Sequence, residues 1–202
     1  MMAAVAAGCG AQQWEFGGWG GAGFLNNVSV TAPLAAATAG FQTGASAGAY
    51  FAQSLHSHFS GELHYAFLQS NLKLASGGNT ATFSGMSHVV HYDVVYHTNR
   101  PSRTQFFAAV GGGMKLFDGT GTEAAYQPLS QFGYFTKTHD VKPMGDFGVG
   151  IRYALTARLT LRVEFRDYIT TFPTQVLTPA PGTKYGSVLH DIVPMVGIGY
   201  QY

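Results

Sequence analysis

The residues from Leu159 to Tyr168 read LTLRVEFRDY, and this stretch decides the fold class. Large apolar side chains stand at every odd position through Phe165, whereas Arg162, Glu164 and Arg166 stand at even positions. Successive side chains of a β-strand point to opposite faces, so a period of two predicts a strand with one apolar and one charged face. A soluble sheet would bury the apolar face and expose the charged one. Whether this strand belongs to a soluble sheet or lies in another environment depends on the pattern in the rest of the chain.

The composition is poor in charge and rich in glycine and aromatic residues. Of 202 residues only 10% are charged, against roughly a quarter in ordinary domains, and the net charge is +1. The chain holds 27 glycines, 15 phenylalanines and 11 tyrosines. No apolar run reaches the roughly 18 residues of a transmembrane helix, and near-neutral charge gives no electrostatic footprint for nucleic acid. Helical membrane proteins and nucleic-acid binders are therefore not expected.

The first residues, MMAAVAAGCGAQQ, look like the tail of a secretory signal peptide. We expect residues 1–11 to be a residual signal peptide and residues 12–202 to form one domain. The single cysteine, Cys9, lies in the removed part, so the mature chain would carry neither a disulfide nor a thiolate metal site. The stretch before Cys9 weakly resembles a lipoprotein processing box, but Ala6 stands where leucine is expected. Lipidation of Cys9 therefore remains an open alternative.

The period-two pattern recurs along the whole chain. Short connections near residues 54–58, 98–103 and 156–158 alternate strictly with longer ones that are rich in Gly, Thr, Ser, Asn and Pro. The segments with this pattern are Trp14–Phe24, Thr43–Gln53, Phe59–Gln69, Val89–His97, Thr104–Lys115, Gly145–Leu155, Leu159–Tyr168 and Asp191–Tyr202.

The alternation of connections indicates the architecture. In an up-and-down barrel successive connections emerge at opposite ends, and outer-membrane barrels have short turns at one end and long loops at the other. Lipid cannot satisfy an open sheet edge, so the sheet must close. The sequence thus predicts an all-β fold, an eight-stranded antiparallel up-and-down transmembrane β-barrel. Its expected external loops are Leu25–Gly40, Ser70–Thr82, Phe117–Asp140 and Ile169–Ser187.

The same assignment answers the question that the opening stretch raises. Its apolar face would meet lipid, and its charges would point into the lumen together with nearly every other strand charge, Asp191 included. An eight-stranded barrel is just wide enough for its side chains to fill, so these charges must pair with one another. The predicted structural network in the lumen consists of Glu15, Glu62, His64, His91, Asp93, Lys115, Asp146, Arg152, Arg162, Glu164 and Arg166.

From Gln12 to Tyr202 the chain resembles the small eight-stranded outer-membrane barrels typified by the OmpA transmembrane domain and OmpX. The hairpin GVGIRYALTARLTLRVEFRDY is similar to the penultimate strands of such barrels. The last strand, IVPMVGIGYQY, resembles their C-terminal assembly signal through Val196, Ile198, Tyr200 and Tyr202. The resemblance implies a monomer in the outer membrane of a Gram-negative-type bacterium. Its implied partners are outer-membrane lipid, the assembly machinery and an external ligand of the loops.

Two residues depart from the pattern. Pro194 falls in the lipid-facing phase and lacks a ladder donor, so a bulge or a place at the outer rim is expected there. Asp167 is also in the lipid-facing phase and is expected at the membrane interface. Aromatic residues should form two girdles, with Tyr168 at the outer one. The expected members of the periplasmic girdle are Trp14, Tyr153, Tyr200 and Tyr202.

Some polar groups invite a catalytic or metal-binding interpretation. Glu62 with His64, and His91 with Asp93, would suit acid–base chemistry if a serine lay nearby. Pairing with the arginines of the lumen is the structural alternative, and we favour it. The other histidines lack the convergent spacing of a zinc site, and the glycine-rich strands lack the helix that a phosphate loop needs. No catalytic residue, cofactor or metal is therefore predicted.

The predicted role is non-enzymatic: an integral outer-membrane protein with a structural or surface-interaction role, its lumen plugged by polar side chains. The alternatives are a narrow pore, a barrel enzyme that modifies lipid or lipopolysaccharide, and a soluble lipocalin-like carrier. A carrier needs an apolar lumen, so the face that carries Arg162, Glu164 and Arg166 discriminates against it.

Overall fold

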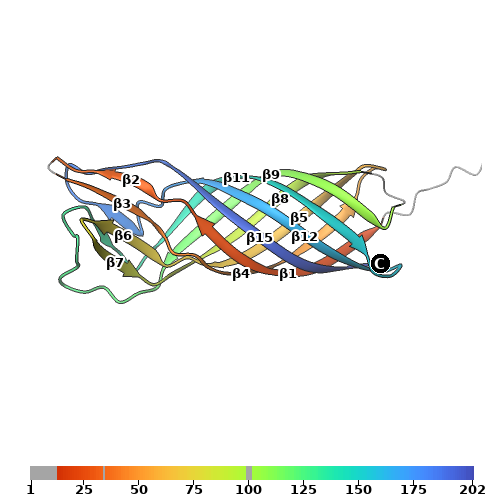
Figure 1. The fold of residues 1–202 in the computed structure, drawn as a ribbon, viewed down its shortest axis with the longest axis horizontal. Helices are drawn as coiled ribbons and strands as arrows, with labels where there is room; N and C mark the ends of the chain where they lie inside the picture. Colours follow the sequence, from red (N-terminus) through yellow and green to blue (C-terminus); the bar gives the residue numbers. More distant parts are fainter. Residues whose placement is uncertain (1–12, 34, 99–101) are drawn as a thin grey trace, which may run out of the picture.

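The computed structural model describes residues 13–33, 35–98 and 102–202, and it is all-β (Figure 1). Eight strands pair antiparallel in the order β1-β15-β12-β11-β9-β8-β5-β4, and β4 returns to β1 to close the barrel. This confirms the predicted fold class. The barrel strands are β1 (Trp14–Leu25), β4 (Gly44–Ser54), β5 (Phe59–Gln69), β8 (Gly85–His97), β9 (Thr104–Gly119), β11 (His139–Ala154), β12 (Leu159–Thr171) and β15 (Val188–Gln201).

The two faces of the barrel wall differ as the period-two pattern predicts. In β12, the side chains of Val163 and Phe165 are 40% and 57% exposed on the outer surface. Their neighbours Arg162, Glu164 and Arg166 are at most 3% exposed, and they point inward. The outer surface is therefore apolar and the bore polar, the reverse of a soluble carrier with an apolar lumen.

The connections also alternate as predicted, but the long ones are not simple loops. Short turns lie at the end of the barrel where the chain ends (Figure 1). At the other end, short strands fill the four long connections in the described part of the chain. They form a five-stranded sheet, β14-β2-β3-β6-β7, and a two-stranded sheet, β10-β13. These strands are β2 (Val28–Thr31), β3 (Ala36–Phe41), β6 (Leu72–Ser76), β7 (Asn79–Phe83), β10 (Gly133–Phe135), β13 (Leu177–Pro179) and β14 (Lys184–Tyr185).

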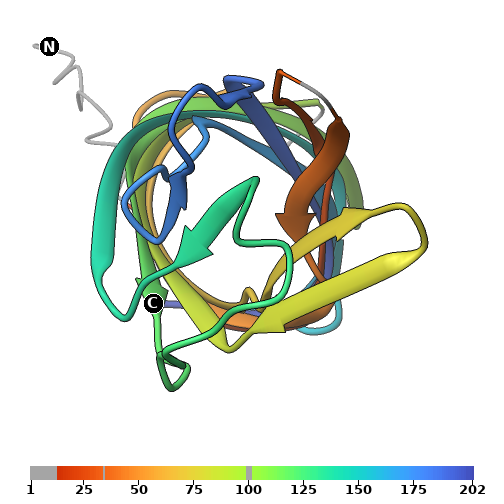
Figure 2. The same ribbon diagram turned by 90° about the vertical axis from the view of Figure 1, so that its left-hand side faces the viewer.

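These short strands and the segments between them form what we call the cap, which lies over the long-connection end of the barrel (Figures 1 and 2). The cap has its own apolar core, which reaches down to Phe117 and Leu189 at the ends of the barrel strands. The four connections expected as external loops therefore contain short strands and a shared apolar core, which the sequence interpretation did not foresee. Alternating apolar pairs such as Val28 and Val30, or Leu72 and Leu74, point inward and are at most 5% exposed.

Pro194 lies neither at a bulge nor at the rim, which corrects the expectation for this residue. It stands in the middle of β15, opposite Phe165 of β12. The ladder between β1 and β15 has no pairs at Ala22 and Gly23, but its register is the same on both sides of the gap. The missing proline donor thus interrupts a few hydrogen bonds without inserting a residue.

Tyr168 is not a girdle residue, because its side chain is fully buried inside the barrel. It belongs to the inward-facing phase of β12, beside Arg166. Asp167 does face outward, near the long-connection end of β12, and its carboxylate lies 2.8 Å from the Nδ1 atom of His190. The predicted signal peptide and Cys9 lie outside the described residues. No helix among the residues searched is long and apolar enough to span a membrane.

Candidate functional site

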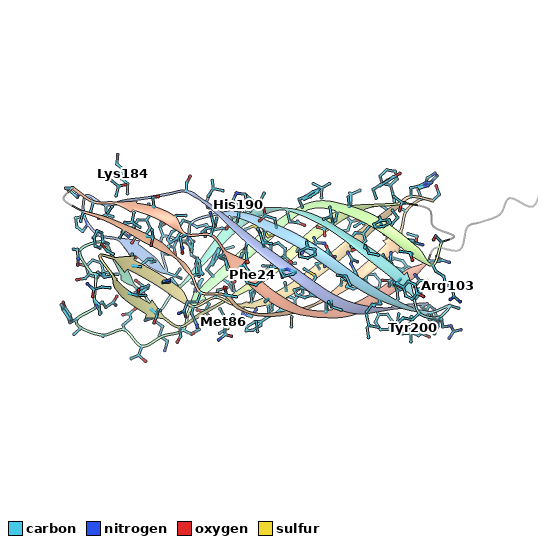
Figure 3. The ribbon with its side chains drawn as sticks, viewed as in Figure 1. Phe24, Met86, Arg103, Lys184, His190 and Tyr200 are labelled. Atoms are coloured by element: carbon cyan, nitrogen blue, oxygen red, sulfur yellow. The ribbon has the colours of Figure 1, made fainter. Side chains whose placement is uncertain are left out.

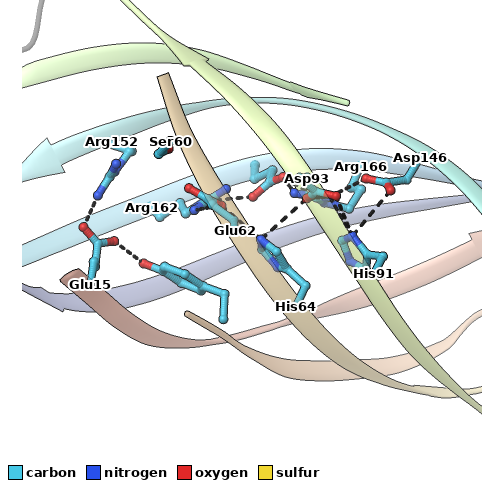
Figure 4. A network of polar contacts seen from close by, with 12 residues as sticks. Glu15, Ser60, Glu62, His64, His91, Asp93, Asp146, Arg152, Arg162 and Arg166 are labelled. Atoms are coloured by element: carbon cyan, nitrogen blue, oxygen red, sulfur yellow. Dashed lines mark hydrogen bonds and ion pairs between the residues drawn. The ribbon is translucent and has the colours of Figure 1, made fainter. Parts of the chain in front are cut away.

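The structure places all the residues of the predicted lumenal network inside the barrel, and none of these residues is more than 8% exposed. They come from six of the eight barrel strands, since β4 and β15 contribute none of the predicted set. Figure 4 shows how they follow one another along the bore, from Glu15 and Arg152 through Arg162 to Arg166 and Asp146.

At the short-turn end, Glu15 of β1 is the centre of the first group. It forms an ion pair with Arg152 of β11, accepts a hydrogen bond from the hydroxyl of Tyr50 (2.6 Å), and accepts another from the Gln201 amide (3.1 Å). The carboxylate therefore has three partners on three other strands, β11, β4 and β15, which ties the barrel wall together across its interior.

Arg162 of β12 forms the second group. Its guanidinium lies 2.8 Å from the carboxylates of both Glu62 and Glu164. Its Cζ atom also lies over the rings of Tyr50 (4.8 Å) and Phe107 (4.3 Å), close enough for cation–π attraction. A cation that two carboxylates and two ring faces surround is well compensated for the loss of water.

Arg166 is the most highly connected cation of the bore. It donates to Glu164 (2.5 and 2.9 Å) and to Asp146 (2.5 Å), and it also forms an ion pair with Asp93. His91 lies against the same carboxylates, with its Nδ1 atom 2.7 Å from Asp93.

His64 continues the group toward Arg162. Its imidazole stacks on that of His91 at 4.8 Å, and its Nε2 atom lies 3.0 Å from Glu62. The histidines thus bridge the carboxylates that the two arginines hold.

Lys115 lies at the end of the polar bore that is next to the cap. Its ammonium group donates to Asp191 at 2.6 Å and lies over the ring of Phe117 at 5.0 Å. Phe117 already belongs to the apolar core of the cap. The bore therefore changes from ion-paired to apolar packing at this level.

One group of the network has the residue types of a metal site. Among the described residues, a metal ion would find three candidate ligands close together, His91, Asp93 and Asp146. The guanidinium of Arg166, however, already bridges the two carboxylates.

A serine–histidine pair also lies inside the barrel. The Oγ atom of Ser60 lies 2.7 Å from the Nε2 atom of His97, and both residues are buried. It is a different pair from the two acid–histidine pairs that the sequence singled out, whose carboxylates contact the arginines.

The short-turn end of the bore contains a cavity in the described part of the chain. This polar cavity of about 340 Å³ extends inward to Glu15 and Arg152, with Gln105, Ser60 and Thr160 among its walls. Arg103 and Tyr200 mark this end in Figure 3, whereas Lys184 lies at the tip of the cap.

The residues of the predicted assembly signal lie on the outer surface of the same end. Val196 and Ile198 are 54% and 55% exposed, Tyr202 is almost fully exposed, and Tyr200 accepts a hydrogen bond from Arg158. Their recognition by assembly machinery remains a prediction.

Tyr50 is a member of the network that the sequence interpretation did not name. It stands in the same phase of β4 as Ser46, Gly48 and Ala52, the face with the smaller side chains. This position in the strand could have identified Tyr50 from the sequence. A large polar side chain among small ones on the same face of a strand is expected to point into the bore.

Comparison with known proteins agrees with this architecture. A family described as "Outer membrane protein beta-barrel domain" matches residues 1–189. Among curated proteins, none matches the sequence significantly. Several solved structures match over nearly their whole length, including the outer membrane protein OprG from Pseudomonas aeruginosa (TM-score 0.63, 13% identity, 95% of this chain and 96% of OprG).

Two further structures show the same fold. The outer membrane protein AlkL matches with a TM-score of 0.56 and 17% identity over 100% of this chain and 95% of AlkL. Neisserial surface protein A matches with a TM-score of 0.54 and 10% identity over 94% of this chain and 97% of that protein. The chain therefore belongs to the outer membrane protein β-barrel domain family, and it is a protein of the bacterial outer membrane.

Proposed function

We propose that this protein is a closed, non-enzymatic barrel that acts at the cell surface through its cap. The observation that supports the proposal most directly is that two kinds of packing fill successive parts of the bore. Ion-paired side chains fill the part between Glu15 and Asp191, and the apolar core of the cap fills the part between Lys115 and the outer end. A bore of eight strands has no width to spare for a channel past these groups.

The cap supports a surface role because it is a folded unit rather than a set of loose loops. Its strands come from all four long connections and pair with one another across them, as β2 does with β14. Shared packing of this kind gives a fixed outer surface, which suits contact with an external partner. We propose that the chain works as a monomer, with outer-membrane lipid around its apolar wall.

Conductance of the refolded protein in a planar lipid bilayer tests the closed bore. We expect no channel events above the background of the lipid at neutral pH. A variant that lacks residues 121–126 of the cap serves as a matched comparison. It should also show no channel events, because the deletion leaves the ion-paired network inside the barrel intact. Steady ohmic conductance of the wild-type protein would favour the narrow pore instead.

A further inference from the structure

The cavity at the short-turn end of the barrel takes no part in the proposed closure of the bore or in the cap. Its volume of about 340 Å³ lies in the range of small-molecule sites. Exposed residues of two short turns, Arg103 and Thr156, belong to its walls, so it reaches the surface at that end. Outer-membrane barrels direct their short turns to the periplasm. A ligand of this cavity would therefore come from the periplasm.

The size of the inward-facing side chains explains why there is room at this level. The inward residues that line the cavity are small: Ala52 of β4, Ser60 of β5, Ala154 of β11 and Thr160 of β12. Two residues further along β4 and β12, the inward positions hold Tyr50 and Arg162, which pack on each other at 4.8 Å. An eight-stranded barrel is usually filled by its side chains, so this change of size leaves space for a ligand.

The walls of the cavity carry an excess of positive charge. Arg103 and Arg152 line it, and Glu15 supplies the one carboxylate among the lining residues that the structure describes. Glu15 is already paired with Arg152 and accepts hydrogen bonds from Tyr50 and Gln201 at the inner end of the cavity (Figure 4). No second carboxylate of the described lining balances the guanidinium of Arg103.

One buried donor of the wall lacks an acceptor. The residue Arg152 is 8% exposed, and its Nε atom is buried without a hydrogen-bond partner among the described residues. Buried donors in native proteins are nearly always paired, and an oxygen atom of a ligand in the cavity can accept from this one. The hydroxyl groups of Ser60 and Thr160 and the amide of Gln105 lie in the same wall. The cavity thus offers hydrogen bonds to a polar ligand over most of its depth.

We propose that this cavity binds a small, singly charged carboxylate that carries several hydroxyl groups, such as a sugar acid. The carboxylate would bind Arg103 at the entrance, because a guanidinium presents parallel N–H donors that match two carboxylate oxygens. The charge of Glu15 disfavours a second anion at the inner end. There a hydroxyl oxygen of the ligand would accept from the Nε–H of Arg152, and further hydroxyl groups would bind Ser60 and Thr160.

The character of the walls discriminates between classes of ligand. An apolar molecule would bury the polar groups of the cavity without hydrogen bonds, which is costly. A phosphate dianion carries more charge than the single excess guanidinium balances. An uncharged polyol would fit the inner part of the cavity but would gain nothing from Arg103. The preferred ligand therefore combines one negative charge with hydroxyl groups.

The test compares matched ligands on the full chain refolded in lipid nanodiscs, which leave both ends of the barrel accessible. The probes are D-gluconate, the uncharged polyol D-sorbitol, which has the same number of carbon atoms, and inorganic phosphate. NMR would follow the backbone amides of Ser60 and Thr160 during each titration. We expect saturable shifts with gluconate, and at least about tenfold weaker binding of sorbitol and of phosphate, because an ionic hydrogen bond contributes at least this factor.

Matched variants locate the site. R103Q should weaken the binding of gluconate by at least about tenfold and leave that of sorbitol unchanged. R158Q removes the same charge from the same end of the barrel, but Arg158 does not line the cavity, so it should bind gluconate like the wild type. A154L fills the space and should abolish the binding of both ligands. Gel mobility that still changes on heating would show that each variant is folded.

Several results would overturn the inference. Absence of saturable shifts with gluconate, or equal affinities for gluconate and sorbitol, would refute a carboxylate site. Tighter binding of phosphate would refute the proposed class of ligand. Equal losses in R103Q and R158Q would show a general effect of charge, and full binding by A154L would place the ligand elsewhere.

Discussion

At the scale of single residues, the bore depends on a few cations that many carboxylates share. Arg166 serves Asp93, Asp146 and Glu164 at once, and it is 1% exposed. Its replacement by methionine would leave three buried carboxylates without their common partner. We expect R166M to lose about 3–5 kcal/mol of unfolding free energy.

Chemical denaturation in detergent micelles measures this loss. The control is R158M, since Arg158 is exposed in a short turn and its side chain donates to the Tyr200 hydroxyl rather than to a buried carboxylate. It should change stability by no more than about 0.5 kcal/mol. Equal effects of the two substitutions would show that the network does not stabilise the barrel.

Glycine residues also make room for the network, and Gly111 is an example. A Cβ atom at Gly111 would lie 2.0 Å from a carboxylate oxygen of Asp93, whereas one at Gly145 would meet nothing within 4 Å. We expect G111A to cost about 1–3 kcal/mol of stability through overpacking and G145A to be close to neutral. Denaturation midpoints of the two variants provide the comparison, and a neutral G111A would contradict the packing described for this layer.

At the scale of elements, the cap has a titratable group that reports on its packing. Burial raises the pKa of the Tyr185 hydroxyl above its ordinary value of about 10, and this hydroxyl donates to the backbone oxygen of Phe132. A raised pKa means that the folded cap favours the protonated phenol. Its contribution to stability is therefore complete below pH 10 and is lost as the pH rises from 10 toward the raised pKa.

Denaturation of the wild type and Y185F between pH 9 and pH 11 tests this sign. The wild type should lose more stability than Y185F as the pH rises, because phenylalanine has no proton to release. Ultraviolet difference spectra of the two proteins should assign a late-titrating phenol to Tyr185. Parallel pH profiles would show that Tyr185 is not buried in the cap.

The barrel strands were predictable and the cap strands were not, for a physical reason that lies in their lengths. A segment such as Leu159–Tyr168 shows enough alternation to fix both its structure and its faces. β2 reads only VSVT and β14 only KY, which is too short for a period to appear. β2 and β14 also come from different connections of the chain, so no local sequence pattern predicts that they pair.

At the scale of the whole molecule, one distribution of side chains explains the family, the membrane and the ion-paired bore. Bulky apolar residues face outward and charges face inward, because lipid surrounds the wall and the narrow lumen forces the charges to pair. The sequence predicted which charges meet in the bore, since strand phase determines the face. It did not predict Tyr168 inside, although the phase of β12 puts this residue on the same face as Arg166. Pro194 lies in the middle of a strand because β15 begins at Val188 rather than at Asp191.

The most direct test of this account measures which face of β12 meets lipid. Single nitroxide labels at L161C, V163C and T160C, each in a C9S background, would be compared by electron paramagnetic resonance in bilayers. Leu161 and Val163 lie in the outward phase, whereas Thr160 lines the polar cavity. We predict that labels at 161 and 163 are more accessible to oxygen than to a water-soluble nickel complex, and that the label at 160 shows the opposite order. The same order at all three positions would contradict the assignment of lipid to one face and the ion-paired lumen to the other.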